Sequence, residues 1–158
     1  MNKDVLVGIR GLQFAETDIK EASTDEDLEK IETICPGEYY FRNNAHFILY
    51  EERFEGFDEP VKNVLKLREK EFSLLKKGMI NVHMVFSEGK KTLTEYATPF
   101  GTILLALDTY SIGIEQGDDH LDISICYGME ANYQFIADCN ISIKIRETNK
   151  IKEAKEQG

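Results

Sequence analysis

The length, composition and charge of the chain exclude several classes of protein. With 158 residues, 42% of them hydrophobic, it is long enough for one domain with a sizeable core and lies outside the disordered range. Its formal net charge of −10 argues against broad attraction to nucleic acid or to an anionic membrane. No apolar run approaches the roughly 20 residues of a membrane-spanning helix, and the first residues lack the pattern of a signal peptide. We therefore expect a cytosolic protein.

The cysteines agree with that location. Cys35, Cys126 and Cys139 are odd in number and widely spaced, and no two of them form a CxxC pair. This spacing argues against a disulfide framework and against a structural zinc site. We expect inert thiols, no metal and no cofactor.

Alternation of apolar and polar residues, which is typical of β-strands, is the dominant pattern along the chain. Residues at this period-two spacing occur at 5–9, 82–86, 103–107, 121–127 and 141–145, and at 47–50, where both faces are apolar. Turn-forming residues separate these runs at 42–45, 55–60, 87–90, 115–119 and 128–132. Seven or more strands with short connections predict an all-β protein with an antiparallel sheet. A chain of this length suits a single barrel of about eight to ten strands, which leaves no exposed edge.

Residues 23–34 leave two alternatives open. Ser23 and Glu26 form a capping box that favours a short helix. A loop that leads into a strand at 28–34 fits the same residues.

Residues 61–77 are also ambiguous. Their apolar residues trace one face of a helix, yet they also suit two strands, and periodicity alone slightly favours the helix. After Glu147 the chain is polar and mostly charged. We expect a barrel domain over residues 1–147 and a flexible, charged tail over residues 148–158.

An ordered set of sequence pieces resembles a known family. The pieces are "GEYYFRNNAHFILYEE", "VKNVLKLREKEFSLLKKGMINVHMVFSEG", "TEYATPFG" and "LDISICYGM". Together they resemble the YwiB-like family of bacterial proteins, over roughly residues 4 to 147. The resemblance implies a small cytosolic protein with a calycin-like, lipocalin-shaped antiparallel β-barrel. No biochemical activity is established for that family as a whole.

The resemblance also bears on two local questions. It implies two strands in residues 61–77, with a hairpin near Glu69 and Lys70. It suggests that residues 98–101, "TPFG", form a bend or bulge between strands, because proline lacks the backbone donor of a paired strand. The chain departs from the family pattern at Lys77, where an arginine before the glycine is frequent, so any role of that arginine is in doubt here.

The first functional hypothesis is a non-enzymatic binder of a small ligand inside the barrel. The candidate polar contacts are Arg10, Tyr50, Glu52 and Tyr96. Tyr50 and Glu52 share one face of a strand, and Glu52 approaches a barrel mouth if that face points inward. Arg10 either faces water or forms an internal pair with Glu52. The alternative is that Glu52 pairs with a lysine on the next strand, and that the tyrosines only fill the core.

The second hypothesis is an interaction module with a filled barrel. Its candidate surface is the basic hairpin around residues 62–77, with Lys66, Arg68, Lys76 and Lys77. The partner would be an acidic protein or RNA, although the net charge argues against nucleic acid in general. A homodimer through an open barrel edge is a further expectation.

An enzyme is the least supported reading. The common hydrolase, zinc-protease and phosphate-loop motifs are missing from the sequence. The segment "GDDH" at 117–120 lacks the calcium-loop pattern and falls where a hairpin turn is expected. We name no catalytic residue and lean against an enzyme.

Overall fold

Ten β-strands make up almost all of the structure, a computed structural model that describes residues 1, 3–11 and 32–148. They are β1 Asp4–Arg10, β2 Glu32–Arg42, β3 Ala45–Glu52, β4 Val61–Arg68, β5 Glu71–Lys77, β6 Val82–Ser87, β7 Lys91–Thr98, β8 Gly101–Gln116, β9 His120–Ala131 and β10 Gln134–Glu147. In these described ranges no helix is long and apolar enough to cross a membrane. Of residues 23–34, where a helix and a strand were both left open, only 32–34 are described, and they belong to β2. The tail expected over residues 148–158 lies outside the described residues except for Thr148.

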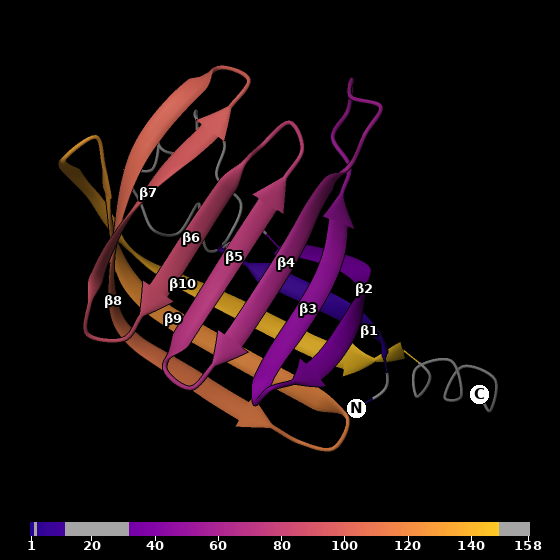
Figure 1. Ribbon diagram of the computed structural model, residues 1–158. Coiled ribbons are helices and arrows are strands. Elements are labelled where there is room, and N and C mark those ends of the chain that lie inside the picture. The colour runs from indigo at the N-terminus through magenta and orange to yellow at the C-terminus, as the bar shows by residue number, and fades with distance from the viewer. Residues whose placement is uncertain (2, 12–31, 149–158) are drawn as a thin grey trace.

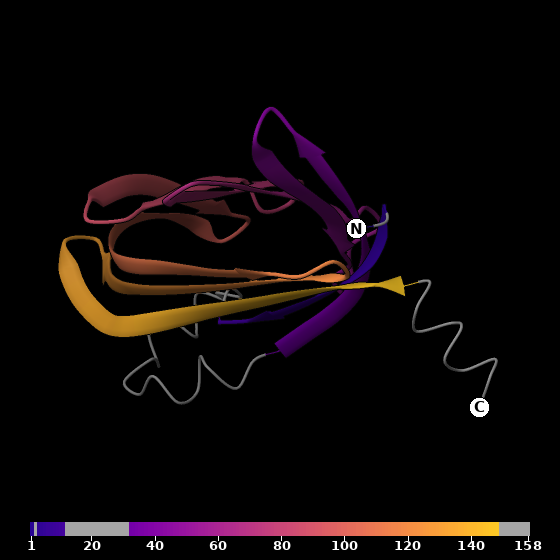
Figure 2. The ribbon, with the colours of Figure 1, turned by 90° about the horizontal axis from the view of Figure 1, so that it is seen from below.

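All ten strands belong to one antiparallel sheet that curls into a nearly closed barrel. Strands that follow each other in the chain are neighbours from β1 to β6 and from β7 to β10, and β1 pairs with β10. The sheet folds over, so that β4, β5 and β6 lie across β8, β9 and β10 (Figures 1 and 2). The predicted single antiparallel barrel of eight to ten strands is confirmed.

The barrel has a seam between β6 and β7, where the described strands lack a regular backbone ladder. The Thr94 hydroxyl donates a hydrogen bond to the His83 carbonyl oxygen at 2.6 Å, and the Thr92 hydroxyl donates to the carbonyl oxygen of Val85. An isolated backbone bridge lies beyond these contacts. At this seam, hydrogen bonds from threonine hydroxyls to backbone carbonyl oxygens therefore connect the two strands where a backbone ladder would otherwise do so.

Residues 61–77 form the hairpin of β4 and β5, so the helix that periodicity favoured is wrong and the two strands implied by the family are confirmed. Glu69 sits in the turn with φ of 53°, a conformation that suits a tight reversal. Leu65 pairs with Leu74 across the ladder, and both point into the core. Sheet pairing and burial override the local helical spacing.

Residues 98–101 form a two-residue turn between β7 and β8, so the expected change of direction between strands is confirmed and takes the form of a hairpin turn. Thr98 pairs with Gly101, so Pro99 and Phe100 connect β7 to β8. Pro99 is thus placed where no ladder donor is needed. Gly101 has φ of 132°, which favours glycine. The sheet is irregular elsewhere, with register shifts in β8 and β10.

Large apolar side chains fill one end of the barrel. Phe72 follows the β4–β5 turn and Phe86 precedes the β6–β7 turn, with ring centroids 5.8 Å apart. Tyr127 packs edge-on against Phe86 at 4.9 Å. We call this the aromatic end. The opposite end, where β3 leads into β4 and β5 into β6, is called the site end.

Candidate functional site

Four inward-facing polar side chains meet at the site end of the barrel. Tyr50 and Glu52 lie on β3, Asn63 on β4 and Lys76 on β5. Their exposed fractions are 5%, 8%, 1% and 3%. Because alternate residues of a strand point the same way, each continues the inward apolar row of its own strand. We call these four residues the polar cluster.

Glu52 is the centre of the polar cluster. The Lys76 ammonium donates a hydrogen bond to Glu52 Oε1 and forms an ion pair with it. Asn63 Nδ2 donates to the same oxygen at 2.9 Å and to the Val61 carbonyl oxygen at 3.3 Å. Asn63 Oδ1 is buried and has no hydrogen-bond partner among the described residues. The polar cluster thus connects three adjacent strands, and one of its acceptor atoms, Asn63 Oδ1, remains without a hydrogen bond in the described part of the chain.

Burial controls the protonation of the neighbouring groups. It raises the pKa of the Tyr50 hydroxyl well above its usual value, and the negative charge of Glu52 raises it further. The half-buried Cys35 thiol on β2 has its pKa raised by the same two causes, burial first and Glu52 second. Both groups therefore stay protonated at neutral pH. A protonated thiol is a poor nucleophile, so these residues offer hydrogen bonds rather than nucleophilic catalysis.

The structure brings together two of the four residues that the sequence singled out. Tyr50 and Glu52 lie side by side in the inward row of β3, as expected. Tyr96 is also buried, but on β7, beyond the seam. Their role in binding a ligand stays a prediction.

Arg10 does not belong to the site. Val5, Val7 and Ile9 take the inward positions of β1. Arg10 follows Ile9 directly, so its side chain points outward and is exposed. The internal pair of Arg10 with Glu52 is therefore wrong. Glu52 forms its ion pair with Lys76, which lies two strands away on β5.

Four aromatic residues that could have lined one pocket, Tyr96, Phe100, Tyr110 and Tyr127, do not lie together. Tyr96 and Tyr127 are buried, whereas Tyr110 is 51% exposed and Phe100 is 80% exposed at a turn. Tyr127 and Tyr96 are part of the filled core, which was the alternative reading.

The basic hairpin keeps three of its four proposed residues on the surface. Lys66, Arg68 and Lys77 are exposed, but Lys76 is buried in the polar cluster. Its place on the interaction surface is wrong, because two successive residues of a strand face opposite sides of the sheet. A hollow of about 420 Å³ lies along the outer face of this hairpin.

That hollow carries charges of both signs. Its lining includes four basic and three acidic residues: Lys66, Arg68, Lys70, Lys90, Glu69, Glu71 and Glu88. Lys70 lies 3.5 Å from Glu88, and the Lys66 ammonium lies over the ring of Phe47 at 5.6 Å from its centroid. The surface is therefore mixed rather than strongly basic, which weakens the case for RNA.

A larger hollow of about 690 Å³ lies against β2, β3 and β4. Its lining includes the half-buried Leu49 and Val64 and the charged Glu51 and Lys62, which alternate with the inward residues of their strands. It therefore opens on the outer side of the sheet. Tyr50 and Asn63 of the polar cluster also belong to its lining.

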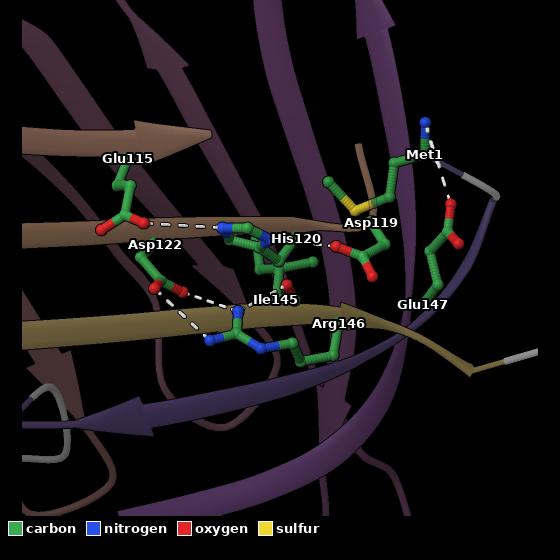
Figure 3. A network of polar contacts seen from close by, with 8 residues as sticks. All are labelled: Met1, Glu115, Asp119, His120, Asp122, Ile145, Arg146 and Glu147. Atoms are coloured by element: carbon green, nitrogen blue, oxygen red, sulfur yellow. Dashed lines mark hydrogen bonds and ion pairs between the residues drawn. The ribbon is translucent and has the colours of Figure 1, made fainter. Parts of the chain in front are cut away.

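An ion-pair network lies at the aromatic end, beside the β8–β9 connection (Figure 3). Ligand-type atoms of Glu115, His120 and Asp122 lie within 4.8 Å of one another. The Arg146 guanidinium, however, binds both oxygens of Asp122, at 2.6 Å and 3.4 Å, and holds the pKa of that carboxyl below its usual value. A metal ion would have to displace this guanidinium. We do not assign a metal site here.

Two members of the polar cluster, Asn63 and Lys76, were not expected inside the barrel. Strand periodicity could have found them, because Asn63 falls between the inward residues Val61 and Leu65, and Lys76 follows the inward Leu74. A polar residue in an inward row is the informative exception.

Comparison with known proteins gives the family. Residues 16–143 match the family model described as a domain of unknown function (DUF1934). The chain belongs to this DUF1934 family. The uncharacterized beta-barrel protein YwiB of Bacillus subtilis (strain 168) is 31% identical over 106 residues, covering 66% of this chain and 72% of that protein. The resemblance to YwiB-like proteins is confirmed.

A solved structure supports the DUF1934 fold. The crystal structure of the ywiB protein from Bacillus subtilis superposes with a TM-score of 0.68 and 22% sequence identity, over 92% of each chain. At this identity the likeness shows the fold alone. The DUF1934 barrel is common to both proteins, and its function has to be argued from the side chains at the site.

Proposed function

We propose that this protein is a cytosolic, non-enzymatic binder of a small molecule, held inside the barrel at the site end. The ligand contacts would come from Tyr50, Glu52, Asn63 and Lys76. One observation carries the proposal: an ion pair and an amide are buried together on the inner wall, with a polar atom left over.

Two features of the barrel support this position for a ligand. The aromatic end is filled by Phe72, Phe86 and Tyr127, so the polar cluster lies at the end away from the aromatic packing. The walls around the cluster are apolar, with Val61 and Val82 among the buried neighbours in register with Glu52 and Lys76. A mostly apolar site with a few converging polar groups is the usual composition of a small-molecule site.

The chemistry of the cluster favours binding over catalysis. Tyr50 and Cys35 stay protonated because burial raises the pKa of each. Glu52 is already engaged by Lys76 and by Asn63. These groups can accept and donate hydrogen bonds, but none is an activated nucleophile.

Native mass spectrometry of protein purified from its own cytosol tests the proposal, together with a thermal-shift screen of small metabolites. We expect a retained small mass, or a rise in melting temperature with one class of compound. Glu52→Gln keeps the shape of the side chain but removes its charge, and should weaken binding of that compound about tenfold or more. Glu51→Gln is the matched control, because it makes the same change at the preceding residue, which is exposed on the other face of the strand.

A clean mass without ligand, and no thermal shift with any compound, would contradict the proposal. Protein or RNA that co-purifies instead would favour the alternative, an interaction module that uses the hairpin surface of Lys66, Arg68 and Lys77. The observation that favours this alternative is the hollow of about 420 Å³ along the outer face of the hairpin.

A further inference from the structure

The amide of Asn63 has a fixed orientation. Its Nδ2 donates to two oxygens, Glu52 Oε1 at 2.9 Å and the Val61 carbonyl at 3.3 Å. Exchanging the amide nitrogen and oxygen would place an oxygen against these two acceptors, so the assignment is unambiguous. The Oδ1 atom therefore points away from both, and it is buried without a partner among the described residues. Such buried acceptors are rare in folded proteins and are costly to leave unpaired.

A donor lies beside this acceptor. Lys76 is the direct cross-strand partner of Asn63 in the β4–β5 ladder, and side chains in such a pair lie close together. An ammonium has three N–H donors, and in the described part of the chain the structure gives that of Lys76 one partner, Glu52. The inner wall thus presents an acceptor and a charged donor on adjacent strands.

The net charge of this spot is zero. The carboxylate of Glu52 balances the ammonium of Lys76, and both are almost fully buried, with side chains 7% and 4% exposed. A third charge brought into this environment would have no partner, and burial of an unpaired charge is strongly unfavourable. An added anion would face Glu52, and an added cation would face Lys76.

We propose that the group recognised here is neutral and carries a hydrogen-bond donor beside an acceptor, as in a primary carboxamide. Its N–H donates to Asn63 Oδ1, and its oxygen accepts from the Lys76 ammonium. An apolar body attached to this head lies among the aliphatic walls formed by Leu65, Leu74 and Val82. This assignment of ligand class rests on the proposed function and narrows it.

Four probes of equal chain length test the assignment. They are hexanamide, N,N-dimethylhexanamide, hexanoate and hexylammonium, titrated at neutral pH into the full-length protein and followed by amide NMR shifts. We expect hexanamide to bind at least about tenfold more tightly than its dimethyl analogue, which keeps the acceptor but lacks the donor. Hexanoate and hexylammonium should bind more weakly than hexanamide. The Asn63 side-chain amide resonance should shift with hexanamide, which reports the contact directly on the unmodified protein.

A substitution changes the preference in a defined way. Asn63→Asp adds one negative charge to the neutral cluster, so it should weaken hexanamide and favour hexylammonium about tenfold. Asn44→Asp is the control, because Asn44 is exposed in the turn at the aromatic end and the added charge is the same. If Asn63→Asp does not fold, the comparison of the four probes on the unmodified protein decides alone.

The outcomes separate this inference from the function on which it rests. Tightest binding of hexanoate or hexylammonium, or equal binding of hexanamide and its dimethyl analogue, overturns the ligand class but leaves a binding barrel. Failure of all four probes also overturns it, and a ligand retained in native mass spectrometry would then keep the proposed function. Failure of the probes without any retained ligand overturns both.

Discussion

Removal of the buried ammonium of Lys76 is the sharpest test of the polar cluster. Lys76→Met keeps the length and packing of the side chain but leaves the Glu52 carboxylate without its ion-pair partner. Both side chains are less than a tenth exposed, so solvent screens the pair very little. Loss of one member of a buried ion pair typically costs about 3–5 kcal/mol.

The geometry places the cost near the lower end of that range. Glu52 keeps the hydrogen bond from Asn63 Nδ2 at 2.9 Å, so its charge is not fully uncompensated. We expect Lys76→Met to reduce the free energy of unfolding by about 3 kcal/mol. For a domain of this size that corresponds to a fall in melting temperature of about 6–12 °C.

Chemical denaturation followed by circular dichroism measures this change, with Lys91→Met as the control. Lys91 forms an ion pair with Glu130 at 2.9 Å, but the two side chains are 49% and 31% exposed. Exposed pairs contribute little, so the control should stay near the unmodified protein. If Lys76→Met were as mild as Lys91→Met, the pair would not be desolvated in solution, and the reasoning about a buried neutral cluster would fail.

Two further predictions concern the seam and the ion-pair network. Replacing Thr92 and Thr94 together by Val removes the hydroxyls of β7 that donate to β6, so amide hydrogen exchange in these two strands should become faster. The control Thr102→Val changes an exposed residue of β8 and should leave this exchange unchanged. Equal exchange rates in the two variants would refute the role of the hydroxyls. Hydrogen bonds from Arg146 lower the pKa of Asp122 in the folded protein. The stability that this pair adds is therefore fully present above the pKa of Asp122 in the unfolded chain, and it is lost as the pH falls through the lower pKa of the folded protein. The difference in unfolding free energy between the unmodified protein and Arg146→Met should therefore shrink from pH 6 to pH 3, and a difference that stays constant would contradict this coupling.

Much of the fold is predictable from the sequence because the sheet buries one face of most strands. The alternation of Leu121, Ile123 and Ile125 predicts the inward row of β9 directly. The hairpin of residues 61–77 is harder, because half-buried Val64 and Leu75 on the outer face add apolar residues to those of the inner face. Two apolar faces in succession imitate helical spacing, and only the pairing of whole strands resolves the ambiguity.

The site is only half predictable, for a different reason. Tyr50 and Glu52 were found from their shared strand face, which is a local property. Lys76 was assigned to the surface because it stands beside Lys77 in a stretch rich in basic residues. The pairing of Lys76 with Glu52 joins residues 24 positions apart in the chain, and no local pattern specifies such a contact. Arg10 was named as a candidate ligand contact, although the alternation of β1 already pointed its side chain outward.

The ion pair itself is an argument for a binding role. Buried ion pairs seldom stabilise a fold more than apolar residues of the same volume, because desolvation offsets most of their attraction. The double variant Lys76→Met with Glu52→Leu should therefore recover most of the stability that Lys76→Met loses. If this apolar variant folds as stably as the unmodified protein but no longer retains the compound found by native mass spectrometry, stability cannot account for the polar cluster and binding does. If the double variant stays as unstable as Lys76→Met and still retains the compound, the cluster is structural, and the ligand contacts lie elsewhere in the barrel.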